Sequence, residues 1–464
     1  MDGDPRERAR HGSAPSRWSA ESAAGITRAA ETVAPAMTPP DPDPAADVHQ
    51  WDSWLLRDRR GEVLTVDGWQ VLFSLTTSAE LLPGKRHDVA EIRYFYSRDG
   101  RDWAFGDRVF DGGALGQRQW AGSAVYDDGS LYVFYTAAGD DGADDLTYSQ
   151  RIAAAHGGSL TTGPDGVGVE GSWTHETLLE PDGKYYETQA QSRGMIYTFR
   201  DPWPFEDPAT GNTHLLFEAN APVPEGSDRC DGDARRQEFN GCVGIATSPT
   251  GDLLEWELRP PLLEAVCVNQ ELERPHVIRR DGRYYLFVSS HQHTFAPGFN
   301  GFDGLYGFVA DSLFGPYEPL NGTGLVLTNP ATAPYQSYSW MAHNHPDGVL
   351  VQHFLNYHEF AGESLDVIGE LPEREQFRRF GGTLGATVRL GVDGATTRVE
   401  GALSPWHIPH ADEELPSREA PWSPEDRLLD AGGERSRGDG VDRNWDDLPT
   451  RGRDSSYRPG SGSH

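Results

Sequence analysis

The amino-acid sequence predicts an all-β fold, either a β-propeller or a β-sandwich, on three observations. Short apolar strands with an aromatic residue near one end recur through the middle of the chain, with no helical pattern between them. Asp-Gly turn sequences precede several of these strands, as β-hairpins require. Aromatic residues make up 11% of the chain, beside 53 glycines and 33 prolines, and this composition is typical of many strands joined by turns.

The composition divides the chain into three regions. Residues 1–44 are polar, and they contain one expected short helix within residues 18–32, because Ser19 is a suitable N-cap and alanines follow it. Residues 45–404 hold the strands and form the expected catalytic domain. Residues 405–464 are acidic and rich in Pro, Arg and Gly, so we expect this tail to be partly disordered or loosely wrapped on the surface.

The expected strands of the middle region are spaced like the blades of a propeller. From their apolar runs, these strands are residues 71–75, 92–96, 131–135, 214–218, 284–288 and 350–354. Tight turns at residues 128–129, 280–282 and 346–348 introduce three of them. Units of this spacing fit about five blades, in which strand ends would converge on a central funnel.

The chain is strongly acidic, with 40 basic residues against 72 acidic ones and a formal net charge of −32. Such a charge repels nucleic acids and anionic membranes, and no apolar run is long enough to cross a bilayer, so we expect neither partner. Lysine occurs only at Lys85 and Lys184. An acidic, lysine-poor surface predicts a halophilic protein; the alternative is an acidic extracellular enzyme encoded by a GC-rich genome.

Three cysteines form neither a disulfide framework nor a zinc-site spacing. Cys230 and Cys242 flank a polar loop, so they would pair in an oxidising compartment or remain free thiols, and Cys267 is the third. The charged N-terminus is followed by no apolar segment, so no ordinary secretory signal peptide is visible. A cytoplasmic location and another export route both stay open.

Three short motifs place carboxylates next to apolar strands, and they form the candidate site. They are residues 49–54 (HQWDSW), 199–202 (FRDP) and 271–276 (ELERPH). Glycoside chemistry needs two carboxylates across a sugar ring, one to attack or stabilise the anomeric carbon and one to protonate the leaving oxygen. A third carboxylate that binds sugar hydroxyls would complete such a pocket. The motifs therefore indicate a sugar-processing enzyme.

The first two motifs also have a purely structural interpretation. Between Trp51 and Trp54, Asp52 would be shielded from water and rigid, as a nucleophile requires; alternatively, it is a turn residue between two core tryptophans. Asp201 precedes a proline, which is typical of a turn. As a site residue it would bind two adjacent sugar hydroxyls, with Arg200 holding it ionised.

The third motif, Glu271-x-Glu273-Arg274, is the most specific. Residues two apart in a strand share a face, so both glutamates point the same way, and like charges this close raise one pKa. A raised pKa is what a general acid needs near neutral pH. A surface ion pair on an edge strand is the alternative, but the apolar hairpin that follows does not fit it. Secondary candidates for the pocket wall and entrance are residues 119–123, residues 335–339, His291 and His293.

Taken together and in this order, the motifs resemble the levansucrase, inulosucrase and β-fructofuranosidase family, glycoside hydrolase family 68. The resemblance runs from about residue 18 to residue 403. Besides the three motifs it includes the strings at 120–123, 217–220, 306–309, 313–317 and 324–327. It implies a five-bladed β-propeller with a central, negatively charged funnel, a retaining enzyme that acts on sucrose, and an extracellular location.

The same resemblance implies roles for individual residues. Asp52 would be the nucleophile that forms a fructosyl-enzyme, Glu273 the acid/base and Asp201 the transition-state stabiliser. His291 would lie at the acceptor side, where it affects whether water or a sugar takes the fructosyl group and how long products grow. The residues that would bind sucrose are Trp51, Trp120, Arg200, Arg274, Glu271 and Tyr338.

Two positions depart from the pattern of the family. Ala121 stands where many relatives have a serine beside the nucleophile, so a hydrogen bond from that side chain is absent. Gln270 stands where calcium-binding relatives have an aspartate. We therefore expect no bound calcium and no other cofactor.

The function implied is a fructosyltransferase that cleaves sucrose and passes fructose to sugar acceptors, giving levan- or inulin-type fructan or fructooligosaccharides, or to water. Three alternatives remain: a β-fructofuranosidase that mainly hydrolyses sucrose, another five-bladed glycosidase that acts on arabinan or fructan, and a non-catalytic carbohydrate-binding propeller. We expect a monomer whose partners are sucrose and fructosyl acceptors.

Overall fold

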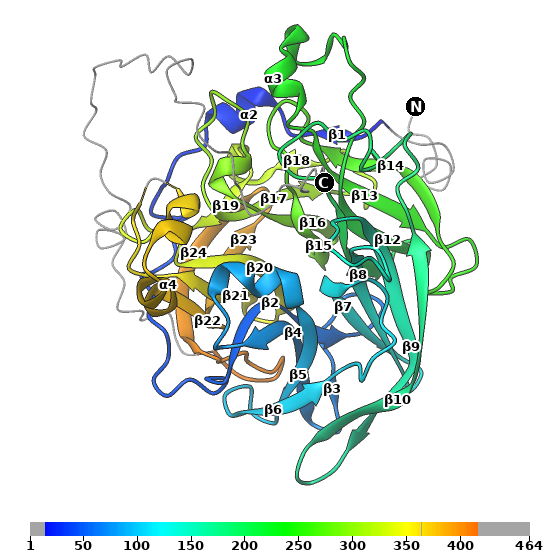
Figure 1. The fold of residues 1–464 in the computed structure, drawn as a ribbon, viewed down its shortest axis with the longest axis vertical. Coiled ribbons are helices and arrows are strands. Elements are labelled where there is room, and N and C mark those ends of the chain that lie inside the picture. The colour runs from blue at the N-terminus through cyan, green and yellow to red at the C-terminus, as the bar shows by residue number, and fades with distance from the viewer. Residues whose placement is uncertain (1–13, 363, 416–464) are drawn as a thin grey trace.

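The computed structural model describes residues 14–362 and 364–415. Within these residues the strands form five antiparallel blades, which follow one another in chain order around a central axis (Figure 1). The five-bladed propeller implied by the resemblance is therefore confirmed. The first blade also joins the second through a short parallel pairing, in which Leu56 and Arg57 lie opposite Ala124 and Val125.

Each blade is built from four main strands, numbered from the axis outward. The first comprises β2 (Val48–Arg57), β4 (Trp69–Ser78), β5 (Glu91–Ser97) and β6 (Trp103–Arg108), with β3 (Thr65–Val66) beside β4. The second comprises β7 (Arg118–Asp127), β8 (Ser130–Ala138), β9 (Gln150–Thr162) and β10 (Val167–Leu179). The third comprises β11 (Phe199–Glu206), β12 (Thr213–Asn220), β13 (Gly241–Thr247) and β14 (Glu257–Glu264).

The last two blades have small additions. The fourth comprises β15 (Glu273–Arg280), β16 (Arg283–Ser290), β17 (Gly304–Ala310) and β18 (Glu318–Pro319), with β19 (Leu325–Thr328) beside β17. The fifth comprises β20 (Ser337–His345), β21 (Gly348–Tyr357), β23 (Ala386–Asp393) and β24 (Thr396–Pro405), with β22 (Phe380–Leu384) beside β21. Short helices in the connections are η1 (Pro83–Val89), η2 (Arg229–Gly232), α3 (Ala234–Gln237), η3 (Gln292–Thr294), η4 (Leu320–Gly322), η5 (Leu365–Glu370) and α4 (Glu373–Arg379).

The hairpin turns form as the sequence predicts. Asp128 and Gly129 both have positive φ, 46° and 81°, and Asp281 and Gly282 have 51° and 82°. Two consecutive residues of positive φ give a turn whose twist matches that of the flanking strands. All six strands expected from apolar runs lie within strands of the structure.

The innermost strand of every blade carries a β-bulge at an equivalent level. At each bulge the register against the second strand shifts by one residue, so the inner strand has one residue more than its partner. A bulge re-aims the side chains beside it. The residue before the shift and the next residue in the chain form what we term the bulge ring: Trp51 and Asp52, Trp120 and Ala121, Arg200 and Asp201, Glu273 and Arg274, and Tyr338 and Ser339.

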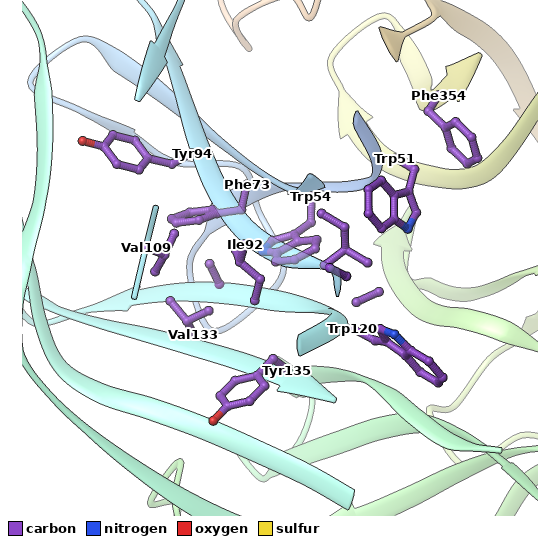
Figure 2. Packing of buried hydrophobic residues seen from close by; sticks show 14 of the residues in the cluster. Trp51, Trp54, Phe73, Ile92, Tyr94, Val109, Trp120, Val133, Tyr135 and Phe354 are labelled. Carbon is purple, nitrogen blue, oxygen red and sulfur yellow. The ribbon is translucent and has the colours of Figure 1, made fainter. Parts of the chain in front are cut away.

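The apolar core lies between the blades rather than at the axis. One cluster packs strands of the first and second blades and extends to the fifth, and Figure 2 shows Trp51 and Trp120 toward one end of it, with Phe73 and Tyr94 farther in. Two of the indole rings that line the candidate site are therefore fixed by the same packing that holds the blades together. Within the described residues, no helix is long and apolar enough to span a membrane.

Residues 14–44 are packed on the propeller. The expected helix is α2 (Ala20–Ala24), whose cap Ser19 accepts a hydrogen bond from the Ser22 N–H at 3.1 Å, and it ends at Gly25, well short of residue 32. β1 (Ser16–Arg17) pairs with β14. Trp18 is buried against the aromatic rings of the fourth blade. The segment thus runs along the outside of the propeller before it enters the first blade.

Residues 405–415 correct the expectation of a loose tail. Trp406 and Ile408 are buried in the core of the first blade, where the Trp103 Nε1–H donates to the Trp406 carbonyl at 2.8 Å. The Ile408 N–H donates to Gly100, whose positive φ of 69° and lack of Cβ permit this close approach. The end of the last blade is therefore fastened to the first. The rest of the tail, residues 416–464, lies outside the described residues.

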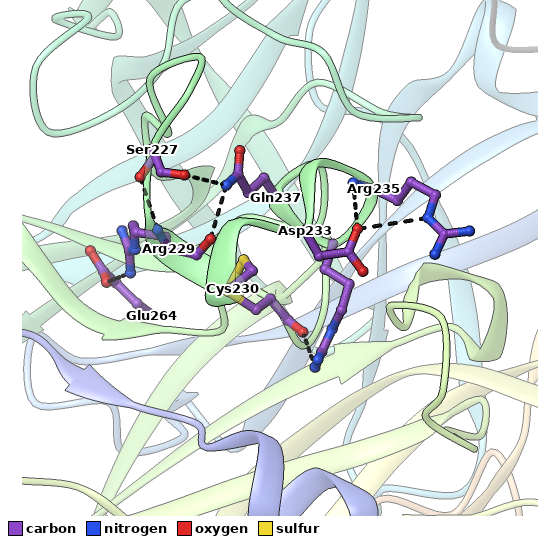
Figure 3. The surroundings of a disulfide bond; sticks show 9 residues. Ser227, Arg229, Cys230, Asp233, Arg235, Gln237 and Glu264 are labelled. Carbon is purple, nitrogen blue, oxygen red and sulfur yellow. Dashed lines mark hydrogen bonds and ion pairs between the residues drawn. A yellow bond between two sulfur atoms is a disulfide. The ribbon is translucent and has the colours of Figure 1, made fainter.

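The cysteine pairing also differs from the expectation. Cys230 is bonded to Cys267 across 37 residues, and Cys242 is a free, buried thiol. Cys242 lies in β13 with its side chain in the core, so it cannot reach the loop that carries Cys230. Figure 3 shows that loop, in which the Gln237 side chain donates to the Ser227 and Arg229 carbonyls. The disulfide ties the loop to the segment that leads into the Glu271–Glu273 motif.

Candidate active site

The structure brings the sequence-predicted residues together on the bulge ring. Eight of its ten positions are residues singled out from the sequence: Trp51, Asp52, Trp120, Arg200, Asp201, Glu273, Arg274 and Tyr338. At four of the five bulges the second residue has positive φ, namely Asp52 (31°), Asp201 (62°), Arg274 (53°) and Ser339 (55°). Non-glycine residues in this conformation are uncommon and concentrate at functional sites.

Arg200 is the cation that several carboxylates of the site share. Its Nε–H donates to Glu218 Oε2 at 2.7 Å, and its Nη2 donates to Glu271 Oε1 at 2.9 Å and to Glu273 Oε1 at 3.0 Å. Burial alone would lower the pKa of the guanidinium, but Glu218, Glu273 and Glu271 outweigh it and raise that pKa. Arg200 is therefore a fixed positive charge, and it binds the acid/base candidate rather than only the Asp201 beside it.

Glu273 has the properties of a general acid. Its side chain is 18% exposed, and its Oε2 accepts a hydrogen bond from the Tyr338 hydroxyl. Burial first and the Glu271 charge second raise the pKa of Glu273 to about 6, against the lowering effects of Arg200, His291 and Tyr338. A carboxyl group with this pKa holds a proton at mildly acidic pH and releases it near neutrality.

Asp201 is buried and held from two sides. Its backbone N–H donates to Thr136 Oγ1 at 2.9 Å, and its Oδ2 accepts from the Arg274 N–H at 2.9 Å. Burial raises the pKa of Asp201 to about 7, while Arg200 and Arg274 lower it and the charges of Glu273 and Asp52 raise it further. Both catalytic candidates thus lie within electrostatic reach of Asp201.

Asp52 lies half-buried between two buried residues of β2. The carbonyl of Trp51 accepts a hydrogen bond from Ser74 Oγ at 2.5 Å, and the Trp51 ring packs edge-on against His87 at 5.5 Å. The Trp120 Nε1–H donates to the His87 carbonyl at 2.9 Å. η1, which carries His87, therefore lies against the two indoles beside Asp52.

Arg274 connects three inner strands. Its Nη2 donates to the Ser53 carbonyl at 3.0 Å, next to Asp52, and its Nη1 donates to Ser339 Oγ at 2.8 Å. With its backbone N–H on Asp201, it links the first, third and fifth blades to the fourth. This side chain is buried, so it fixes the spacing of the bulge ring.

His291 and Tyr338 form the side of the site next to Glu273. Their rings stack at a centroid distance of 3.6 Å and an angle of 12°, and His291 Nε2 lies 4.0 Å from Glu273 Oε2. The His291 Nδ1 is 2.9 Å from Asp303 Oδ2. Burial alone would lower the pKa of His291, but the charges of Asp303, Glu273 and Glu271 raise it to about 9. His293 stacks on His291 at 5.0 Å.

Four residues of the site were not singled out from the sequence. Glu218 is fully buried on Arg200; an acid in the middle of an apolar strand was the only signal for it. Thr136 joins two bulges, because its hydroxyl donates to the Ala121 carbonyl and accepts from the Asp201 N–H. Ser339 and Asp303 hold Arg274 and His291 and carry no local signal at all.

Gln270 does not have the surroundings of a metal ligand. Its Oε1 accepts from the Met195 N–H at 3.2 Å, and its Nε2 donates to the Ile196 carbonyl at 2.8 Å. Both ends of the amide therefore bind backbone. Across residues 14–362 and 364–415, no group of three or more His, Cys, Asp or Glu side chains is arranged to hold a metal ion.

Comparison with known proteins places this geometry in a family. The family model described as Levansucrase/Invertase matches residues 8–404. Levansucrase LscA of Pseudomonas savastanoi pv. glycinea is 37% identical over 435 residues, which covers 85% of this chain and 97% of that protein. The extracellular sucrase of Zymomonas mobilis subsp. mobilis is 36% identical over 377 residues, covering 78% and 87%.

A solved structure is also similar along its whole length. The inulosucrase from Halalkalicoccus jeotgali, bound to kestose, is 61% identical with a TM-score of 0.86, and the match covers 87% of this chain and 99% of that one. The match of fold, sequence and family model shows that this chain belongs to the levansucrase/invertase family of glycoside hydrolases.

Proposed function

We propose that this chain is a retaining fructosyltransferase that cleaves sucrose, with Asp52 as nucleophile, Glu273 as acid/base and Asp201 as stabiliser. The observation that carries the proposal is the arrangement on the bulge ring, where Asp201 senses the charges of both Asp52 and Glu273. Levansucrase and inulosucrase relatives cover most of the chain and support sucrose as the substrate.

The first half-reaction needs one acid and one nucleophile. Glu273 gives its proton to the oxygen that leaves with glucose, while an Asp52 oxygen bonds to the anomeric carbon of the fructosyl group. The C–O bond to glucose breaks, and its electron pair stays with the protonated oxygen. Asp201 accepts hydrogen bonds from fructosyl hydroxyls, which strengthen as positive charge develops on the ring.

The second half-reaction reverses the role of Glu273. Its carboxylate removes a proton from an acceptor hydroxyl, the acceptor oxygen bonds to the anomeric carbon, and Asp52 leaves. Arg200 and the Tyr338 hydroxyl stabilise the ionised form of Glu273 at this stage. A pKa of about 6 serves both steps, because neither form is rare between pH 5 and 7.

The acceptor decides between transfer and hydrolysis. The 61% identity with an inulosucrase bound to kestose supports transfer to a sugar, with inulin-type products, over hydrolysis. Resolving oligosaccharides from free fructose at high sucrose concentration measures this ratio. Fructose equal to glucose at every sucrose concentration would establish the hydrolase instead.

The catalytic assignment is tested by two substitutions and a control. Asp52→Ala and Glu273→Ala each remove glucose release from sucrose, by at least about 10³-fold, while circular dichroism shows an intact fold. Asp311→Ala is the matched control, since this side chain is 87% exposed, and it keeps wild-type activity. Substantial turnover in either site variant would contradict the assigned role.

We further propose that the enzyme acts outside the cell, as a monomer and without a metal. The Cys230–Cys267 disulfide supports an oxidising compartment, and the extracellular sucrase relative agrees with it. A net charge of −32 opposes self-association. Light scattering coupled to gel filtration and fractionation of the native host test the two statements.

A further inference from the structure

Asp303 is a buried carboxylate with a fixed orientation beside the site. Its side chain is 1% exposed, and it directly precedes β17. Its carbonyl accepts a hydrogen bond from Thr328 Oγ1 at 2.9 Å, and its Oδ1 accepts from the Gln292 N–H at 2.7 Å. The neighbouring Phe302 is fixed through its N–H and carbonyl by the Tyr306 hydroxyl. The carboxylate therefore has little freedom to turn.

The remaining oxygen of this carboxylate binds His291. Asp303 Oδ2 lies 2.9 Å from His291 Nδ1, and an ionised carboxylate only accepts, so Nδ1 carries a proton. The opposite nitrogen, Nε2, then lies on the side of Glu273, at 4.0 Å from Oε2. Stacking on Tyr338 fixes the plane of the ring. Asp303, His291 and Glu273 thus form a line that ends at the acid/base.

We propose that Asp303 is a positioning residue: it holds His291 as a cation with Nε2–H directed at the acceptor side of Glu273, and so favours a sugar over water as fructosyl acceptor. The inference rests on the proposed function, and it adds the residue that sets the charge and orientation of His291. A fixed N–H donor next to the base orients an incoming sugar hydroxyl, whereas water needs no such orientation.

The charges around His291 agree with a cation at this position. Acidic groups outnumber basic ones, and the only other imidazoles in the surroundings are on its own segment and on η1. The titratable groups that face it are Asp303 and His293 from its own loop, Glu273 and Glu271 from the start of β15, Tyr338 from β20, and His87 from η1. The Asp303 contact is the shortest of these polar contacts, so its loss has the largest effect on the imidazolium.

The test removes the charge of Asp303 and keeps its shape. Asp303→Asn still accepts the Gln292 N–H through its amide oxygen, but it no longer neutralises His291. We expect the ratio of fructosyl transfer to hydrolysis at saturating sucrose to fall at least fivefold, with glucose release reduced much less. Asp311→Asn, the same change on an exposed side chain, keeps the ratio. Asp303→Glu restores the charge and recovers part of the ratio.

A readout independent of activity is the titration of His291, measured by NMR of imidazole-¹⁵N-labelled enzyme. We expect a midpoint near 9 in the wild type, as the surrounding carboxylates indicate, and one at least two pH units lower in Asp303→Asn. In a His291→Gln background, adding Asp303→Asn changes the ratio no further, because Asp303 acts through His291.

The outcomes separate this inference from the proposed function. A wild-type His291 that titrates near 6.5 overturns the inference without any variant, and so does an Asp303→Asn enzyme that folds and keeps its transfer ratio. A further loss on adding Asp303→Asn to His291→Gln also overturns it. A wild type that releases no glucose from sucrose overturns the proposed function instead, and the titration then still reports on Asp303 and His291.

Discussion

The hydrogen bond from Tyr338 to Glu273 gives a quantitative prediction for the pH profile. Tyr338→Phe removes the hydroxyl that donates to Glu273 Oε2 and keeps the ring that stacks on His291. The bond favours the ionised form of Glu273, so its loss raises the pKa of this carboxyl group above its present value of about 6.

The size of the shift follows from the partners of Glu273. A hydrogen bond to a charged group contributes about 1.5–3 kcal/mol, and one pKa unit corresponds to about 1.4 kcal/mol, so complete loss would raise the pKa by roughly one to two units. The Glu273 side chain is 18% exposed, and water replaces part of the lost bond. The Arg200 contact also remains at 3.0 Å. We therefore expect a rise of about one unit.

The assay is the initial rate of glucose release at sucrose well below KM, from pH 4.5 to 9 at constant ionic strength. Glu273 must be protonated for the first step, so kcat/KM falls as pH rises through its pKa, and this alkaline limb moves up by about one unit in Tyr338→Phe. Tyr285→Phe is the control, because this hydroxyl binds the Gly394 carbonyl outside the site. The reasoning fails if the limb stays in place or moves equally in both variants.

Three further predictions concern stability and ions. Cys267→Ser lowers the free energy of unfolding by about 2–4 kcal/mol, since the disulfide closes a loop of 37 residues; Cys242→Ala costs less, and a reductant affects only proteins that keep the bond. Denaturant melts with and without reductant check this, and equal losses would contradict it. Activity and melting temperature fall from 1 M to 0.01 M salt, because screening of the −32 net charge extends over about 3 Å at 1 M but about 30 Å at 0.01 M; full activity at low salt would remove the halophile hypothesis. Dialysis against a chelator leaves glucose release unchanged, because backbone groups bind both ends of the Gln270 amide; a loss that calcium restores would refute this.

Much of the fold could be predicted because its signals are local. Apolar runs and Asp-Gly turns mark the strands and hairpins one by one, and each depends on a few consecutive residues. The Cys230–Cys267 bond could not be read in this way. Its partners lie 37 residues apart, and the nearer Cys242 is excluded only by the direction of its side chain in β13.

The candidate site divides along the same line. Asp52, Asp201 and Glu273 stand in recognisable strings, so the motifs identify them. Asp303 and Glu218 gain their importance from partners distant in the chain, at 12 and 18 residues, and no pattern around them shows it. The end of the catalytic domain was placed too early because Trp406 and Ile408 are two apolar residues within a polar run, and only packing on the first blade reveals their role.

The bulges of the inner strands also determine where this chain tolerates insertions and deletions. Successive side chains of a strand point to opposite faces, so removing the extra residue at one bulge would reverse every position beyond it relative to the second strand. Length changes are therefore confined to the hairpin loops and blade connections. Mutagenesis that alters loop length around the rim leaves the five bulges in phase, and a one-residue deletion at any of them disables both the blade and the site.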